Sequence, residues 1–400
     1  MPSKTTSMAI TIIIFFGIIS LLGDIIYEGA RSVNGPYLKL LGANATMVGL
    51  IVGSGELIGY ALRLLSGYLS DKTRAYWFFT ILGYSLLISI PLLALTGHWQ
   101  IAALLIIVER IGKGLRSPAR DTLVSYATKK VGTGFGFGII EFLDQLGALI
   151  GPMIFVVLLS SNAEKTIADY QKAYAAFWIP FFLLLAILLI TFFKFKVTVE
   201  PKEREDEPLE NKKLFWFYSI FIFFTTFGFV NFAIVGYHLK TNNIVSDAQI
   251  PLLYAFAMIV DALCGLFIGK LYDIIKVKRK NKKAGLVVTL ILPVFSILSI
   301  LLVFLQDLRA IYVAMFFWGF VLGAHETIMK AAVADLTSIR KRGRAYGVFN
   351  TVYGSAVFLG SLVGGYLYDI SIDFMIAALV LAEIVSLVFL IVLKNVAENY

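Results

Sequence analysis

The chain contains twelve apolar stretches, each long enough to cross a lipid bilayer as a helix. A transmembrane helix needs about 20 mostly apolar residues, and each stretch here is bounded by a short polar or Gly/Pro-containing turn. The first is too long for a cleaved signal peptide, so we expect a retained helix. The approximate limits are 8–36, 44–70, 75–96, 99–127, 133–160, 171–196, 213–239, 248–275, 284–305, 308–337, 343–369 and 372–394. The sequence predicts an all-α membrane protein with twelve transmembrane helices.

Composition and charge support this assignment and indicate an orientation. Hydrophobic residues make up 59% of the chain and charged residues 15%, which is rare in soluble domains. Lys and Arg gather in the loops after the second, fourth, eighth and tenth stretches, and cytoplasmic loops carry such an excess. We therefore expect both termini to be cytoplasmic. The net charge of +9 then faces anionic lipid headgroups, and we expect no nucleic-acid partner.

One long polar segment divides the stretches into two sets. Residues 196–213 include the run PKEREDEPLENKK, which is charged, contains proline and lacks helical apolar periodicity. We interpret this segment as a cytoplasmic linker. It would join an N-terminal six-helix bundle, residues 1–195, to a C-terminal six-helix bundle, residues 214–400.

The two sets share a glycine pattern. A shift of 213 residues superposes three glycines of each half, Gly134, Gly147 and Gly151 on Gly347, Gly360 and Gly364. Internal repeats of this kind place two bundles around a midplane site in many transporters, so we predict two pseudo-symmetric bundles. Glycines four residues apart also let helix backbones approach closely, which is a purely structural alternative.

Charged side chains interrupt two of the apolar stretches at helical spacing. A charge at membrane depth costs roughly 2.5–3.5 kcal/mol on insertion scales, so it persists where it is paired or faces a watery cavity. Residues three or four apart share one face of a helix. The two rows are Asp24, Glu28 and Arg31 in the first stretch and Glu109, Lys113, Arg116 and Arg120 in the fourth. They predict a polar pathway through the protein.

Several motifs resemble those of the major facilitator superfamily. The loop after the second stretch reads GYLSDKTR at residues 67–74, similar to the family's signature of glycine, aspartate and basic residues, although the signature's next glycine is missing. Arg110 and Gly114 resemble its second motif. The runs at 24–37 and 109–121 resemble a prokaryotic branch of the family. The resemblance, which covers the whole chain, implies a secondary transporter with the superfamily's fold.

The fourth and fifth stretches are expected to form an antiparallel hairpin that turns near Lys130. With a rise of about 1.5 Å per residue, Arg116 would lie level with Asp144 and Arg120 level with Glu141. One interpretation is a set of structural salt bridges. The other is a switch, in which a carboxylate alternates between a paired and a desolvated environment and so couples protons to transport.

Five carboxylates are candidates for carrying a coupled proton: Glu28, Asp24, Glu141, Asp144 and Glu56. Glu28 leads because helix one lines the central cavity in the superfamily that the chain resembles. Glu56, near the middle of the second stretch, has a simpler alternative, which is pairing with Arg63.

The second half contributes an acid opposite a base. The 213-residue shift brings Glu326 opposite Lys113, which suggests a dipolar cavity suited to a zwitterion or an anion. The alternative is that Lys113 and Glu326 pair directly as a gate between the bundles. His325 is an alternative proton carrier. The predicted substrate-binding residues are Arg31, Arg110, Lys113, Glu326, Asn231 and His325.

Gating roles follow from the family resemblance. Asp71 resembles a latch at the cytoplasmic gate, with Arg120 as the matching base at the inner end of helix four. Gly147, Gly151 and Pro152 resemble the family's glycine-proline motif of antiporters, although later glycines of that motif are absent. The predicted gating residues are Asp71, Arg116, Arg120, Gly147, Gly151 and Pro152.

These patterns predict a secondary active transporter that moves a small polar, zwitterionic or anionic solute by alternating access, coupled to protons by symport or antiport. A proton-antiport multidrug efflux pump and an uncoupled facilitative uniporter are the alternatives. An enzyme is not expected, because no nucleophile, metal or nucleotide motif is found. We expect no cofactor beyond the proton gradient, no metal, a monomer among membrane lipids, and a place in the cytoplasmic membrane of a prokaryote. The single cysteine, Cys264, excludes an intrachain disulfide.

Overall fold

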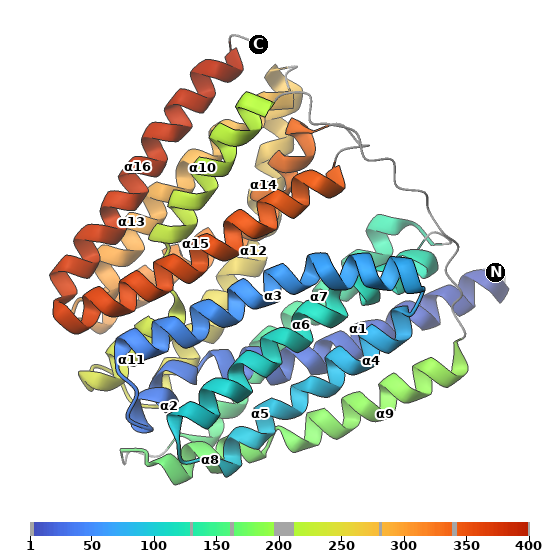
Figure 1. The fold of residues 1–400 in the computed structure, drawn as a ribbon, viewed down its shortest axis with the longest axis horizontal. Coiled ribbons are helices and arrows are strands. Elements are labelled where there is room, and N and C mark those ends of the chain that lie inside the picture. The colour runs from blue at the N-terminus through green and yellow to red at the C-terminus, as the bar shows by residue number, and fades with distance from the viewer. Residues whose placement is uncertain are drawn as a thin grey trace. The chain divides into compact units, whose positions relative to one another are not determined.

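All the regular secondary structure in the described part of the chain is helical. This computed structural model describes residues 4–128, 131–160, 164–195, 212–279, 282–337 and 342–398. The first half contains α1 (Lys4–Arg31), α2 (Asn34–Leu40), α3 (Ala45–Thr73), α4 (Tyr76–Ser85), η1 (Leu86–Ile88), α5 (Ser89–Leu92), η2 (Leu93–Leu95), α6 (Trp99–Thr128), α7 (Thr133–Leu158), α8 (Ile167–Ala175) and α9 (Trp178–Lys194). The second half contains α10 (Lys212–Gly228), α11 (Phe232–Thr241), α12 (Gln249–Arg279), η3 (Lys282–Leu290), α13 (Ile291–Val303), α14 (Leu308–Leu336), α15 (Arg342–Ile370) and α16 (Ile372–Glu398). Figure 1 shows the labelled helices.

The described helices confirm the twelve predicted spans. Ten helical segments are long and apolar enough to cross a membrane, and the shorter apolar segment Val287–Val303 adds one. The remaining span is α6, whose 30 residues are long enough but carry the row of charged side chains. Each of these twelve spans lies within a few residues of its predicted limits.

The chain divides into two compact units. Unit 1 comprises Met1–Ala43, Ser54–Lys202 and Ser246–Ala255, and unit 2 comprises Asn44–Gly53, Glu203–Val245 and Phe256–Tyr400. The first turns of α3 therefore belong to unit 2 and those of α12 to unit 1. The predicted linker, 196–213, lies outside the described residues as far as residue 211, so the predicted bundle limits stay a prediction.

Glycines bring α7 against α1 in unit 1. These helices pack along each other far more extensively than α7 packs on α6. A Cβ atom added at Gly147 would lie 2.9 Å from the Asp24 Cβ, and one added at Gly151 would lie 2.7 Å from the Gly29 backbone nitrogen. Only a residue without a side chain permits this approach, so both glycines have the packing role that sequence analysis offered as an alternative.

Unit 2 repeats this arrangement with α15 against α10. Gly360, the residue that the 213-residue shift pairs with Gly147, lies against the backbone carbonyl of Phe227 near the end of α10. α10 also packs on α16. The core of this unit buries aromatic side chains such as Phe215, Tyr218 and Phe221. The repeated glycine pattern thus corresponds to the same kind of helix contact in both units.

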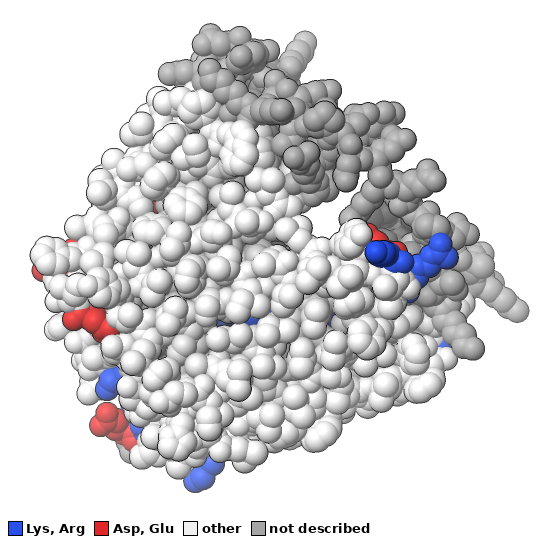
Figure 2. Space-filling view, viewed as in Figure 1, with Lys and Arg blue, Asp and Glu red and all other residues white. Residues whose placement is uncertain are grey.

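The outward surfaces of the helices suit a lipid environment. Large apolar side chains such as Leu266, Leu95 and Phe193 are 79%, 76% and 73% exposed. On the face that Figure 2 shows, uncharged atoms cover the sides of the helices, and the charged residues drawn in colour gather mainly near helix ends. Exposing this much apolar surface is unfavourable in water and favourable in a bilayer.

One span is interrupted in its middle. α10 ends at Gly228, and α11 begins at Phe232 after three residues without regular structure. Asn231 is the N-cap of α11, and its side-chain oxygen accepts a hydrogen bond of 2.9 Å from the Ala233 backbone N–H. The last four carbonyl groups of a helix have no donor within that helix, so the carbonyls at this break need partners from elsewhere, as Val230 has in the Trp318 indole N–H at 2.9 Å.

Candidate functional site

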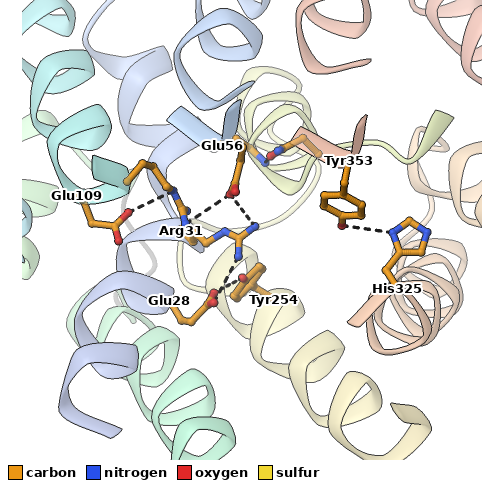
Figure 3. A network of polar contacts seen from close by, with 10 residues as sticks. Glu28, Arg31, Glu56, Glu109, Tyr254, His325 and Tyr353 are labelled. Carbon is orange, nitrogen blue, oxygen red and sulfur yellow. Dashed lines mark hydrogen bonds and ion pairs between the residues drawn. The ribbon is translucent and has the colours of Figure 1, made fainter. Parts of the chain in front are cut away.

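Six charged side chains of unit 1 form an alternating chain of acids and bases, shown in part in Figure 3. In order they are Glu28, Arg31, Glu56, Arg110, Glu109 and Arg116, and we call them the ion-pair network. Arg31 lies 3.4 Å from a carboxylate oxygen of Glu28 and 3.4 Å from one of Glu56. Arg110 lies 3.4 Å from Glu56 and 3.2 Å from Glu109. Arg116 ends the chain, 3.9 Å from Glu109.

Helix geometry explains how three helices supply this network. Glu28 and Arg31 lie three residues apart on α1, and Glu109 and Arg116 lie two turns apart on α6. Glu56 projects from α3 between them. Gly55 permits the approach, because a Cβ atom there would lie 2.9 Å from the Arg110 Cγ.

The predicted alternative for Glu56 is wrong. Glu56 pairs with Arg31 and Arg110, whereas the Arg63 guanidinium lies 4.7 Å from the centroid of the Tyr60 ring. Arg63 was an obvious candidate because it lies two turns from Glu56 on the same helix. The sequence does not show how close Arg110 of α6 comes to Glu56.

A tyrosine that sequence analysis missed completes one end of the network. The Tyr254 hydroxyl, from the part of α12 that belongs to unit 1, donates a short hydrogen bond to Glu28 (Figure 3). The two residues lie 226 positions apart, and no local pattern links them. Glu28 therefore has both a cationic and a neutral donor, which together stabilise its charged form.

Two charged residues beside the network have no ion pair. The Lys113 Nζ lies over the Tyr27 ring, 3.9 Å from its centroid. Among the described residues, no carboxylate lies within 4.0 Å of Lys113 and no base within 4.0 Å of Asp24. Both are half-buried. The unit thus presents an ammonium and a carboxylate, each without a direct ion pair among the described residues, on neighbouring helices.

A second cluster surrounds Arg120. Its guanidinium lies 2.9 Å from Asp121 and 3.8 Å from Asp144, and it donates a hydrogen bond of 2.5 Å to the Ser20 hydroxyl. Sequence analysis had placed Arg120 level with Glu141, which is exposed instead.

Arg116 also differs from its predicted register. It pairs with Glu109 on its own helix and lies 5.0 Å from the Tyr84 ring, not beside Asp144. The prediction assumed that α6 and α7 pack along each other as a hairpin. In the structure α7 packs along α1, so the level of its acidic residues is set by α1 and its glycines.

The predicted cytoplasmic latch has its two members in different surroundings. Asp71 accepts a hydrogen bond of 3.1 Å from the Tyr76 hydroxyl, while Arg120 is engaged by Asp121 and Asp144. Pro152 lies within α7, directly after Gly151, the glycine that lets α7 approach α1. Its side chain is buried. Gating by these residues stays a prediction.

The predicted residues of unit 2 are less closely connected. Asn231 caps α11, and Glu326 is exposed. His325 is buried; its Nδ1 lies 3.5 Å from the Tyr353 hydroxyl (Figure 3), and its ring lies 5.2 Å from that of Phe229. The proposed relation between Lys113 and Glu326 joins the two units and stays a prediction.

A buried acid of unit 2 escaped sequence analysis. Glu383 on α16 is 0% exposed, and one of its carboxylate oxygens accepts a hydrogen bond of 3.0 Å from the Thr225 hydroxyl. The available signal was a lone carboxylate in the middle of the last apolar stretch. Such a residue inside a membrane span is a candidate functional residue.

Comparison with known proteins identifies the class to which this fold and polar interior belong. The family model described as Major Facilitator Superfamily matches residues 5–238 and 216–399, which together cover nearly the whole chain. The chain belongs to the major facilitator superfamily, a family of membrane transporters.

Its relatives include bacterial and archaeal proteins. An uncharacterised protein of Mycobacterium tuberculosis is 36% identical over 391 residues, covering 95% of this chain and 92% of the relative. An uncharacterised MFS-type transporter of Methanocaldococcus jannaschii is 28% identical over 376 residues, covering 89% of this chain and 88% of the relative.

Two solved structures share the fold. The nucleoside transporter NupG has a TM-score of 0.73 at 15% identity, covering 97% of this chain and 99% of its own. A bacterial homolog of the human lysosomal transporter Spinster, in an inward-facing and unoccupied conformation, has a TM-score of 0.69 at 14% identity. The match covers 99% of this chain and 97% of that structure. At these identities the likeness shows the fold alone.

Proposed function

We propose that this transporter moves a small polar solute with an anionic group, either an anion or a zwitterion, by alternating access and with proton coupling. The observation that carries the proposal is that Lys113 has no direct ion pair among the described residues, beside a network in which every arginine has a carboxylate partner. Family membership supports transport itself.

Lys113 is well placed to bind an anion. Its ammonium is half-buried, and its contact with Tyr27 contributes only about 0.5–2 kcal/mol, less than an ion pair in the same surroundings. A substrate carboxylate or phosphate would supply the missing partner. Lipophilic cations suit the site poorly, because the Lys113 ammonium repels them and the three glutamates of the network are already paired with arginines.

Asp24 is the carboxylate best placed to couple a proton. Glu28 and Glu56 are each held by arginines, whereas Asp24 has no ion pair among the described residues. An ionised Asp24 attracts Lys113 through space and so competes with an incoming anion. Protonation of Asp24 removes that competition, which links proton binding to anion binding. A zwitterion would instead place its own ammonium near the ionised Asp24.

The proposal is tested by thermal stabilisation of the purified carrier against amino acids, dipeptides, organic anions and lipophilic cations. A ligand at 100 times its dissociation constant adds about 2.7 kcal/mol. We expect stabilisation by anions or zwitterions that is lost in Lys113→Gln and retained in Lys172→Gln, an exposed lysine of the same unit. In Asp24→Asn, anion binding should persist and lose its dependence on pH.

Two other outcomes would favour the alternatives. Stabilisation by lipophilic cations alone would indicate proton-antiport multidrug efflux. A substrate flux into proteoliposomes that does not change when a proton gradient is imposed would indicate a facilitative uniporter.

We further propose a monomer in the cytoplasmic membrane of a prokaryote, with both termini on the cytoplasmic side. The bacterial and archaeal relatives and the basic loops support this placement. Labelling of single cysteines introduced at the two termini, from each side of the membrane, tests the orientation in a Cys264→Ala background.

A further inference from the structure

The carboxyl group of Glu383 lies in a closely packed, polar part of unit 2. Gly228 makes room for it, because a Cβ atom added there would lie 2.8 Å from the Glu383 Oε1. Thr225, one turn earlier on α10, donates to the Glu383 Oε2 at 3.0 Å. The Ser296 hydroxyl of α13 faces the same carboxyl without meeting hydrogen-bond geometry. Three helices therefore direct oxygen atoms toward one point.

Several of these buried oxygen atoms have no partner. The Glu383 Oε1 and the hydroxyls of Ser296, Ser299 and Ser386 lack a hydrogen bond among the described residues. Ser299 lies one turn along α13 from Ser296, and Ser386 one turn along α16 from Glu383, so each shares a face with its neighbour. We call these four residues and Thr225 the Glu383 cluster. Unpaired buried polar atoms are rare in native proteins, and a group of them indicates a bound species.

The described part of the protein offers this carboxylate no compensating cation. Among the described residues, none of the bases lies within 4.0 Å of Glu383, and no charged side chain acts on it. α13 contains no basic residue.

The helix break beside Glu383 adds negative potential. Gly228 is the last residue of α10, and the C-terminal end of a helix carries about half a negative charge and carbonyl groups that have no donor within the helix. The negative end of α10 repels an ionised Glu383 beside it. A cation, by contrast, is attracted both by the Glu383 carboxylate and by the end of α10. Discontinuous helices in other transporter folds use such carbonyls to coordinate sodium ions.

We propose that the Glu383 cluster and the C-terminal end of α10 form a sodium-binding site in unit 2. A hard cation prefers oxygen ligands, and a single carboxylate balances one positive charge, which favours a monovalent ion over Ca²⁺ or Mg²⁺. A proton on Glu383 would engage one oxygen only, whereas a sodium ion engages several at once. The site uses neither Lys113 nor Asp24, so it adds a second coupling ion and does not depend on the proposed substrate class.

Sodium binding is tested on the purified full-length protein by thermal unfolding in NaCl, KCl and choline chloride at equal ionic strength, and by equilibrium binding of ²²Na⁺. We expect saturable stabilisation by NaCl alone and binding of one ion per chain. Glu383→Gln should abolish both. Ser296→Ala, which keeps the carboxylate, should raise the half-saturating Na⁺ concentration by about tenfold or more. Asp373→Asn, at the exposed start of the same helix, should behave as the unaltered protein.

Equal ²²Na⁺ binding by the unaltered protein and Glu383→Gln would overturn the proposal. So would stabilisation by acid with no sodium effect, which would make Glu383 a protonated structural carboxyl. If Glu383→Gln fails to fold, an unchanged sodium affinity in Ser296→Ala would overturn the proposal instead. Substrate stabilisation that needs Lys113 is measured separately, so the two proposals fail independently.

Discussion

Arg110 is the residue on which the ion-pair network most depends. It is 4% exposed and joins two acids, with Glu56 at 3.4 Å and Glu109 at 3.2 Å. Arg110→Gln would leave both carboxylates beside an uncharged side chain. At an effective dielectric constant of about 20, each pair contributes about 5 kcal/mol of direct attraction, most of which offsets desolvation.

Removing one partner of a buried ion pair typically costs about 3–5 kcal/mol, because the other charge remains buried. We expect Arg110→Gln to destabilise the protein by this amount, which lowers its unfolding midpoint by about 6–20 °C. The assay is thermal unfolding in detergent, followed by the fluorescence of the five tryptophans.

Two comparisons make the test specific. The double variant Glu56→Gln/Arg110→Gln should recover part of the loss, with an interaction energy of about 0.5–3 kcal/mol. Arg309→Gln, at an exposed arginine, should change stability by less than about 0.5 kcal/mol. If Arg110→Gln is as stable as Arg309→Gln, the network does not stabilise the fold and our reasoning is refuted.

Three further predictions use the same unfolding assay. Gly151→Ala should cost about 1–3 kcal/mol by overpacking α7 on α1, whereas Gly138→Ala on the same helix, with nothing within 4 Å, should be neutral or stabilising. Asp369→Ala should cost about 0.5–2 kcal/mol, because Asp369 accepts bonds of 3.1 and 2.8 Å from the first N–H groups of α3. Burial raises the pKa of Tyr37 from 10.0 to about 12. The protonated hydroxyl therefore stabilises the folded protein fully below pH 10, and this contribution is lost as the pH rises to about 12. Tyr37→Phe should lose hydrogen bonds to two backbone carbonyls and abolish this alkaline loss.

Each of these predictions has a result that contradicts it. Equal midpoints for Gly151→Ala and Gly138→Ala would mean that α1 and α7 separate easily. An unchanged midpoint for Asp369→Ala would show that the start of α3 needs no cap. An alkaline loss that persists in Tyr37→Phe would assign it to another group.

The class of fold and the rows of charged residues could be predicted from the sequence. Apolar length and helical periodicity are local properties, so the twelve spans and the acid-base rows of α1 and α6 were predicted from them. The glycine repeat likewise predicted equivalent helix contacts, seen at Gly147 and Gly360.

Which charged residues pair with one another depends on how the helices pack. Arg120 reaches Asp144 and not Glu141 because α7 packs along α1, and Glu28 receives a hydrogen bond from Tyr254, 226 positions away. Glu383 is isolated from every described base only because of the faces that α10 and α13 turn toward it. The physical reason is the range of the interactions. A helix forms from contacts among its own neighbouring residues, whereas an ion pair between two helices requires their atoms to approach within 4.0 Å, and packing between distant segments sets that distance.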